Sequence, residues 1–143
     1  MMRLRPVRWE NMMIEHPNSL LMHHCLQAAN AGDRKTLRAL WAPDIVWHIK
    51  GVGPWHGDIK GADNVLEHFA KIGNIGITGL HTQIKDVMVS NHRASMLCHT
   101  YAEIGDRVLD ADFLVIAEIF DRRIQTITSI PIDPERVAEF WPD

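Results

Sequence analysis

Long apolar runs, an excess of positive charge and cysteine are all absent or scarce in this sequence of 143 residues. No apolar run reaches the roughly 18 residues that a membrane-spanning helix requires. The N-terminal segment MMRLRPVRWENMMIEH also lacks the apolar core of a secretory signal peptide. The 15 Lys and Arg are interspersed with 18 Asp and Glu, which gives a formal net charge of −3. We therefore expect no membrane and no nucleic acid as partner, and favour a small-molecule ligand.

Only two cysteines are present, Cys25 and Cys98, and they do not form a C-x-x-C pair. We expect both to be reduced, buried thiols in a cytoplasmic protein, because such a chain does not depend on disulfides. The histidines are scattered, and His23 and His24 are neighbours on a predicted helix, so they point to different faces. We expect no metal ion and no other cofactor.

The length is that of one domain, which would bury about two-thirds of the surface that the unfolded chain exposes. Regular apolar patterning begins only near Pro17. We therefore divide the chain into an N-terminal arm, residues 1–15, and a single domain, residues 16–143.

Helical spacing of apolar residues dominates the first half of this domain. The predicted elements are helices over residues 17–32, 34–42 and 62–72, a strand over 44–49, and a loop with Gly and Pro over 51–61. Asp33 is suited to cap the second helix, and Pro43 ends it.

Strand patterns fill most of the second half. Strands are predicted over residues 81–90, 93–104, 107–120 and 124–132, separated by short turns, and a last helix begins at Asp133-Pro134. Helices followed by strands indicate an α+β fold, in which helices pack across one face of a curved antiparallel sheet.

Residues 110–120 are apolar on both faces of their predicted strand, although a solvated face should be polar. One face carries Asp112, Leu114, Ile116 and Glu118, and the other carries Phe113, Val115, Ala117 and Ile119. No remaining element is available to cover the second face. We therefore expect a homodimer packed sheet to sheet, with the Phe113 face at the interface.

Several segments together resemble the SnoaL-like branch of the NTF2-like superfamily, which also holds ketosteroid isomerases and limonene epoxide hydrolases. They are AGD at 31–33, LWAPDIVWHIKGVGPWHGDIKGADNV at 40–65, IFDRRI at 119–124, and a closing Asp133 with Phe140-Trp141. The resemblance implies a conical α+β fold, commonly dimeric, whose helices and concave sheet enclose a deep apolar pocket.

The sequence departs from two branches of this superfamily. Where ketosteroid isomerases have a carboxylate base, their oxyanion-hole tyrosine and a second acid, this chain has Ile49, Cys25 and Ile116. The arginine of the epoxide hydrolases has no match within residues 95–103. Polyketide cyclases use a histidine on the third strand and an aspartate on the next, and His99 and Asp112 fall near those places.

Burial in an apolar cone raises the pKa of a carboxyl group and makes it a usable base near neutral pH. We therefore expect Asp112 to be the catalytic base, with His99 as orienting partner and Tyr101 as phenol donor. The alternative is that Asp112, close to a hairpin, makes turn hydrogen bonds or lies in solvent.

Large apolar side chains are the candidates for the ligand pocket. They are Trp41, Trp47, Trp55, Phe69, Leu114 and Ile116. Trp55 lies in the Gly-Pro loop and is our candidate for a residue that closes over ligand. The alternative is that these rings simply fill the core.

Two function classes follow, with a third as a weaker alternative. The first is a cofactor-independent cyclase or isomerase, in which Asp112 removes a proton next to a carbonyl of an apolar substrate such as a polyketide, and His99 or Tyr101 stabilises the enolate oxygen. The second is a noncatalytic binding protein for a hydrophobic small molecule. The third is a protein-interaction dimer with a filled cone.

Overall fold

A computed structural model describes residues 16–51, 56–73 and 75–141 of the chain. The predicted arm, residues 1–15, and Trp55 lie outside the described residues. The elements are α2 (Pro17–Ala31), α3 (Arg34–Leu40), β1 (Trp41–Ile49), β2 (Gly57–Lys60), α4 (Ala62–Gly73), β3 (Thr78–Val89), β4 (Arg93–Ile104), β5 (Arg107–Phe120), β6 (Arg123–Pro131) and α5 (Pro134–Phe140). No helix in these ranges is long and apolar enough to cross a membrane.

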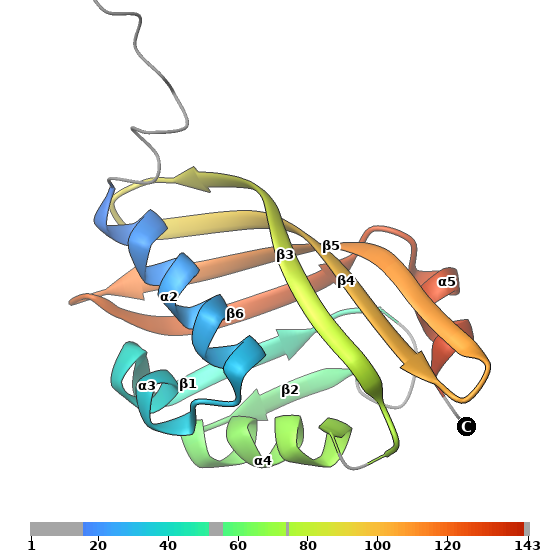
Figure 1. Cartoon of the computed structure of the whole chain (residues 1–143). Coiled ribbons are helices and arrows are strands. Elements are labelled where there is room, and N and C mark those ends of the chain that lie inside the picture. The colour runs from blue at the N-terminus through green and yellow to red at the C-terminus, as the bar shows by residue number, and fades with distance from the viewer. Residues whose placement is uncertain (1–15, 52–55, 74, 142–143) are drawn as a thin grey trace, which may run out of the picture.

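The six strands form one sheet in the order β2-β1-β6-β5-β4-β3. All neighbours are antiparallel except β1 and β6, which run parallel. The predicted α+β fold with a curved sheet is confirmed, but the sheet is mixed, and the expected loop 51–61 contributes strand β2. In Figure 1 the sheet is strongly twisted, with α2, α3 and α4 on one face. We call this helix-covered face the inner face and the opposite one the outer face.

Local signals set the helix boundaries. The side chain of His16 accepts a hydrogen bond from the N–H of Asn18 at the start of α2, and Gly32 ends the helix in the left-handed conformation, with φ of 68°. Asp33 caps α3 as predicted, since its carboxylate accepts a hydrogen bond from the N–H of Thr36 at 3.1 Å.

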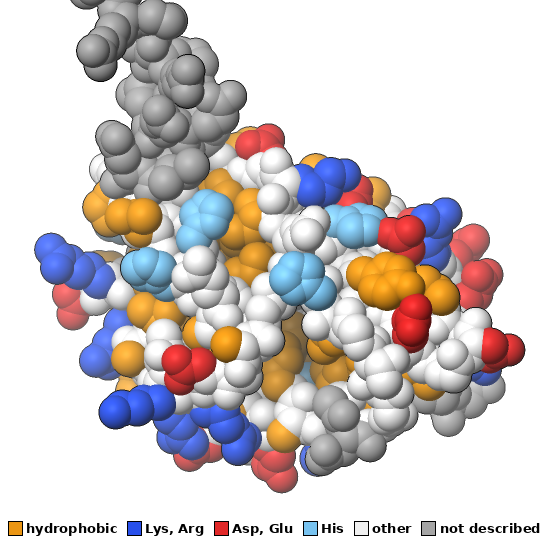
Figure 2. Space-filling view, in the orientation of Figure 1, with side chains coloured by type: hydrophobic (Ala, Val, Ile, Leu, Met, Phe, Trp, Pro, Cys, Tyr) orange, Lys and Arg blue, Asp and Glu red, His pale blue; other side chains and the backbone are white. Residues whose placement is uncertain are grey.

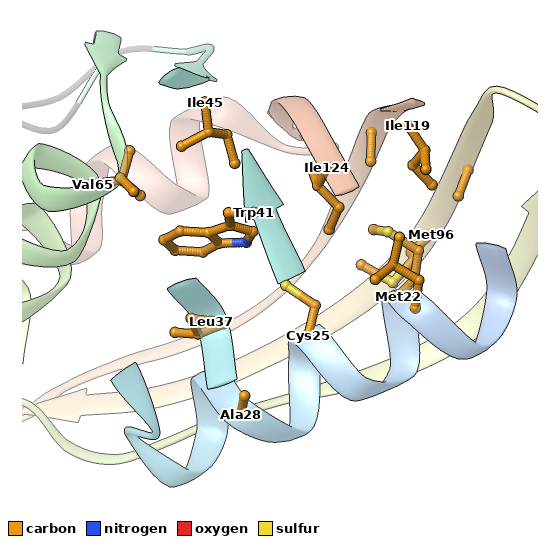
Figure 3. Packing of buried hydrophobic residues seen from close by; sticks show 14 of the residues in the cluster. Met22, Cys25, Ala28, Leu37, Trp41, Ile45, Val65, Met96, Ile119 and Ile124 are labelled. Atoms are coloured by element: carbon orange, nitrogen blue, oxygen red, sulfur yellow. The ribbon is translucent and has the colours of Figure 1, made fainter. Parts of the chain in front are cut away.

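A hollow opens between the C-terminal part of α2, helix α4 and strand β3, and apolar side chains form its visible walls (Figure 2). Behind it lies the main core. In Figure 3, Met22 and Cys25 of α2 point toward the sheet, where Met96 and Ile124 meet them, and Trp41 occupies the middle of the cluster. Burial of these side chains removes their apolar surface from water and holds the helices on the inner face.

A second, smaller core lies beneath α5. Val137 and Phe140 of this helix pack against Ala102, Leu109 and Ala111 of the β4–β5 hairpin. The side chain of Asp133 accepts a hydrogen bond from the N–H of Arg136 and so caps the helix, as the Asp-Pro pair predicts. This cluster supports the far end of the β4–β5 hairpin.

The β4–β5 register decides which residues face the helices. Cys98, which is buried, pairs with Phe113, and His99 pairs with Asp112. Because paired residues share a face, Phe113 and the other odd-numbered residues of β5 lie on the inner face. The prediction that the Phe113 face forms a dimer interface is therefore wrong, since the cores already cover it.

The same β4–β5 register places Leu114 and Ile116 on the outer face, opposite Leu97 and Ser95 of β4. They are half-buried there and lie away from the helices. Their predicted role as walls of the ligand pocket is therefore also wrong. Both faces of β5 carry apolar side chains, so the alternation along the strand could not show which face packs against the helices.

We expect replacement of Ile124 with Ala to lower the free energy of unfolding by about 2–5 kcal/mol, because the side chain is 0% exposed and its loss leaves a cavity. The same change at Ile132, which is 57% exposed, should shift it by less than about 0.5 kcal/mol. Urea denaturation of both variants provides the measurement. Equal destabilisation would contradict this assignment of the core.

Candidate functional site

Three of the predicted ligand residues come together on the inner side of β1 and α4. The rings of Trp47 and Phe69 stack with centroids 4.5 Å apart and planes at 28°, and Trp41 lies 6.3 Å from Phe69. Trp41 is only 2% exposed and fills the core, whereas Phe69 is 37% exposed. Trp47 and Phe69 therefore provide an accessible aromatic wall, and Trp41 supports it from behind.

His68 joins this wall, although it is not among the residues predicted from the sequence. Its ring meets Trp47 edge-on, with centroids 5.6 Å apart and planes at 86°. Burial, with a further contribution from the charge of Lys71, lowers the pKa of His68. His68 is three residues from Val65 and four from Ile72, which places it on the same face of α4. This spacing is the sequence pattern from which its place on the inner side could have been predicted.

Ser129 provides a hydroxyl group at the same place. The parallel β1–β6 pairing sets Ile49 beside Ser129, and the indole N–H of Trp47 donates a hydrogen bond to Ser129 Oγ at 2.9 Å. Trp47 therefore contacts both polar groups, through its N–H at Ser129 and through its ring at His68.

A second polar group closes the gap between α2 and β3. The side-chain NH₂ of Asn30 donates to the carbonyl oxygen of Thr82, and its side-chain oxygen accepts from the N–H of Thr82. The hydroxyl groups of Thr82 and Thr100 lie 2.9 Å apart. These contacts hold the end of α2 against the sheet beside the hollow.

Within the described part of the chain, strands β3 to β6 present no carboxylate on the inner face. The residues of these strands whose register places them on this face are apolar, Thr, Ser or Cys apart from Arg107 at the start of β5, and none is Asp or Glu. Burial raises the pKa values of Cys25 and Cys98 to about 11 each, so both thiols stay protonated at neutral pH. Within the described part of the chain, no three His, Cys, Asp or Glu side chains converge as metal ligands.

The predicted pair of His99 and Asp112 forms, but on the outer face. His99 Nδ1 lies 2.7 Å from Asp112 Oδ1, its Nε2 contacts the carboxylate of Asp110, and Lys85 Nζ donates to Asp112 Oδ2 at 2.9 Å. We call these four residues the outer cluster. The expectation that His99 and Asp112 face into the cone is wrong, because their neighbours Cys98 and Phe113 take that side of the sheet.

Charge in the outer cluster works against a role for Asp112 as a base. Hydrogen bonds from His99 and Lys85 hold the pKa of Asp112 below its usual value. The hydrogen bond with Asp112 in turn raises the pKa of His99. A carboxylate that acts as a buried base near neutral pH requires a raised pKa, which is the opposite of the shift at Asp112.

Tyr101 lies on the outer face as well. It is 39% exposed, and its hydroxyl donates a hydrogen bond to Glu103 Oε1 at 2.5 Å, which raises the pKa of the phenol. The three predicted catalytic side chains are thus neighbours on adjacent strands, as their parity indicated, but the sheet separates them from the hollow.

The sequence of residues 22–127 matches the SnoaL-like domain. The chain therefore belongs to the SnoaL-like family. No curated protein matches this SnoaL-like chain. Solved structures do, and their NTF2-like fold agrees with the one described above.

Three of these structures illustrate the similarity. Bal32a, from a soil-derived mobile gene cassette, has 26% sequence identity and a TM-score of 0.82, over 88% of this chain and 97% of its own. An NTF2-like protein from Burkholderia xenovorans has 18% identity and a TM-score of 0.74, over 87% and 95%. TerC, co-crystallised with polyporic acid, has 14% identity and a TM-score of 0.78, over 87% and 97%.

The contacts in the outer cluster predict a change in the pKa of His99 that NMR can measure. Replacement of Asp112 with Asn removes the main cause of the raised pKa of His99, so that pKa should fall. A pH titration of the His99 ring signals measures it. The exposed Asp44, replaced with Asn, is the control and should leave the pKa of His99 unchanged.

The same Asp112 variant should show a pH-dependent loss of stability. The raised pKa of His99 stabilises the fold below its usual 6.5, and this contribution is lost as the pH rises through the raised value. The lowered pKa of Asp112 stabilises the fold above its usual 3.8 and is lost as the pH falls through the lowered value. The deficit of the variant in unfolding free energy should therefore be larger at about pH 5 than at about pH 9. A deficit that does not change with pH would contradict the ion pair.

Proposed function

We propose that this protein binds an apolar, ring-containing small molecule in the hollow between α2, α4 and β3. The observation that carries the proposal is the stacked pair of Trp47 and Phe69, whose rings are large, rigid and partly accessible. Such a wall favours a flat ligand, which buries apolar area and stacks on the rings. The Ser129 hydroxyl, which accepts the indole proton of Trp47, would orient a polar substituent of such a ligand.

Two further observations support a ligand in this place. The Thr82 and Thr100 hydroxyls lie 2.9 Å apart on the inner face of β3 and β4, and would add polar contacts for a ligand on this face. The similar structure of TerC was obtained with polyporic acid, so a protein of this fold has been co-crystallised with a small organic molecule. The binding role needs neither a metal ion nor another cofactor.

Carboxylate chemistry at Asp112 is not part of this proposal. A carboxylate that removes a proton from a ligand must contact the ligand. Asp112 is engaged with His99 and Lys85 on the other side of the sheet, and its pKa is lowered. Of the functions considered from the sequence, binding of a hydrophobic small molecule fits this geometry best.

We also propose that two copies of the chain associate through their outer faces. The middle of this face carries Leu97, Leu114, Ile116 and Ile130, which are half-buried and have none of the described helices over them. A second copy would present the same apolar surface and cover it symmetrically. The homodimer expected from the sequence is thus retained, with the opposite face of β5 at the interface.

For the hollow, we expect Phe69→Ala to weaken the binding of 2-naphthol, a flat bicyclic phenol, about tenfold, or about 1.4 kcal/mol. The reason is the loss of one of the two stacked rings. Isothermal titration calorimetry measures the Kd. Tyr101→Ala is the matched control, because it removes an aromatic ring of similar exposure from the outer face and should leave the Kd unchanged. A wild-type protein that does not bind 2-naphthol would refute the proposed function.

For the interface, we expect Ile116→Glu to convert the dimer into a monomer, because a carboxylate would be buried without a partner between two sheets. Light scattering coupled to size-exclusion chromatography measures the mass. Leu20→Glu introduces the same charge at an exposed position of α2 and should leave the dimer intact. A wild-type protein that is monomeric at micromolar concentration would refute the interface.

A further inference from the structure

We propose that a groove between the β3–β4 turn and the β5–β6 turn binds a free α-amino acid with an apolar side chain. The Arg93 guanidinium would bind the α-carboxylate, and the Glu118 carboxylate would bind the α-ammonium group. Phe120 would contact the apolar side chain. The groove lies at one end of the outer face, so this site is separate from the hollow and needs neither the ligand nor the dimer proposed above.

The groove lies where two hairpins turn at the same end of the sheet (Figure 1). Its volume is about 470 Å³, which is in the range of pockets for small molecules. The residues at its walls include Ser90, His92 and Arg93 from the β3–β4 connection, and Glu118, Phe120 and Gln125 from the β5–β6 hairpin.

Backbone contacts hold the β3–β4 wall of the groove in place. The N–H of Ile119 in β5 donates a hydrogen bond to the carbonyl oxygen of His92 at 2.8 Å. The side-chain NH₂ of Asn18, which is buried at the start of α2, donates to the carbonyl oxygens of Ser90 and Asn91. This wall is therefore ordered before a ligand binds, which lowers the entropic cost of binding.

Two opposite charges line the groove without bonding to each other. The β4–β5 register pairs Arg93 directly with Glu118, and such partners have Cβ atoms about 5 Å apart. No ion pair or hydrogen bond joins their side chains, and the guanidinium has no partner among residues 16–51, 56–73 and 75–141. A ligand that carries both charges close together would bridge these two side chains.

The acidic side of the groove offers two acceptors. The Thr126 hydroxyl donates to Glu118 Oε1 at 3.2 Å, which positions the carboxylate and leaves Oε2 for a ligand. The side-chain NH₂ of Gln125 donates to the carbonyl oxygens of Phe120 and Arg123, so its side-chain oxygen is also available. An ammonium group has three N–H donors and can use both acceptors.

The other parts of an α-amino acid match the remaining walls. A guanidinium group binds a carboxylate through two parallel hydrogen bonds, which Arg93 can provide. The Phe120 ring is 67% exposed beside the groove, and an apolar side chain packed on it would remove apolar surface from water. Because the carboxylate and the ammonium group share one carbon, a single small ligand reaches all three places.

The test is a titration of isotope-labelled, full-length protein with L-phenylalanine, followed by NMR of the backbone amides. Two analogues each lack one charge: L-phenylalanine amide has no carboxylate, and N-acetyl-L-phenylalanine has no ammonium group. The variants are Arg93→Gln and Glu118→Gln. Arg123→Gln and Glu139→Gln are the matched controls, because they remove the same charges at exposed positions outside the groove.

We expect wild-type protein to bind L-phenylalanine with a Kd of about 1 mM, with the largest shifts at the two turns. Each groove variant should weaken this binding about tenfold, and the controls should not change it. Arg93→Gln should leave the Kd of the amide unchanged, and Glu118→Gln should leave that of the N-acetyl analogue unchanged, because each analogue already lacks the group that the altered residue would bind. This pattern distinguishes lost contacts from a misfolded variant.

Three results would overturn the amino-acid site. They are no saturable shifts up to about 10 mM L-phenylalanine, groove variants with the wild-type Kd, and analogues that bind as tightly as L-phenylalanine. Shifts that Phe69→Ala abolishes and the groove variants retain would place the ligand in the hollow, which would overturn this site and leave the proposed function standing.

Discussion

The register between β4 and β5 is the constraint on which the rest of this structure depends. It pairs Cys98 with Phe113 and His99 with Asp112. Since paired residues share a face, these pairs decide on which face each residue of the two strands lies. One side of the hairpin then carries the cores beneath the helices, and the other carries the outer cluster. A shift of one strand by one residue would turn its own polar residue, His99 or Asp112, toward Cys25 and Met22, where its charge would lose hydration.

This register also explains why strong polar contacts and a ligand site occur on different sides of the sheet. The carboxylates of Asp110 and Asp112 are stabilised by His99 and Lys85 in a partly hydrated place, where an ion pair does not have to overcome a large desolvation cost. The inner face of β3 to β6 has the opposite character, because its described polar groups are few and, apart from Arg107, neutral. Neutral groups such as Ser129 and His68 remain compatible with an apolar ligand, because they add direction without a charge that must be desolvated.

Much of the fold was predictable from the sequence, because its signals are local. Asp33 and Asp133 cap helices as expected, and the order of helices and strands follows from spacing and turn residues. The face of β5 that packs against the helices was not predictable, because Leu114 and Ile116 are as apolar as Phe113 and Val115, and only pairing with β4 distinguishes them.

The candidate site was likewise predictable only in part. Trp47 and Phe69 were selected by size and come together, whereas His68 was missed because its burial depends on β1, a strand that its own helix does not reveal.

The parallel pairing of β1 with β6 has a consequence for the order in which the molecule is assembled. The hydrogen bond between Trp47 and Ser129 joins residues 82 positions apart, so closing this loop is entropically costly and the contact cannot form early. During synthesis, β1 leaves the ribosome long before β6 exists. Trp47 therefore lacks its hydrogen-bond partner until nearly the whole chain has been synthesised. The hollow is therefore finished by the last strand, and a chain that contains its aromatic wall lacks a hydroxyl beside it until β6 docks.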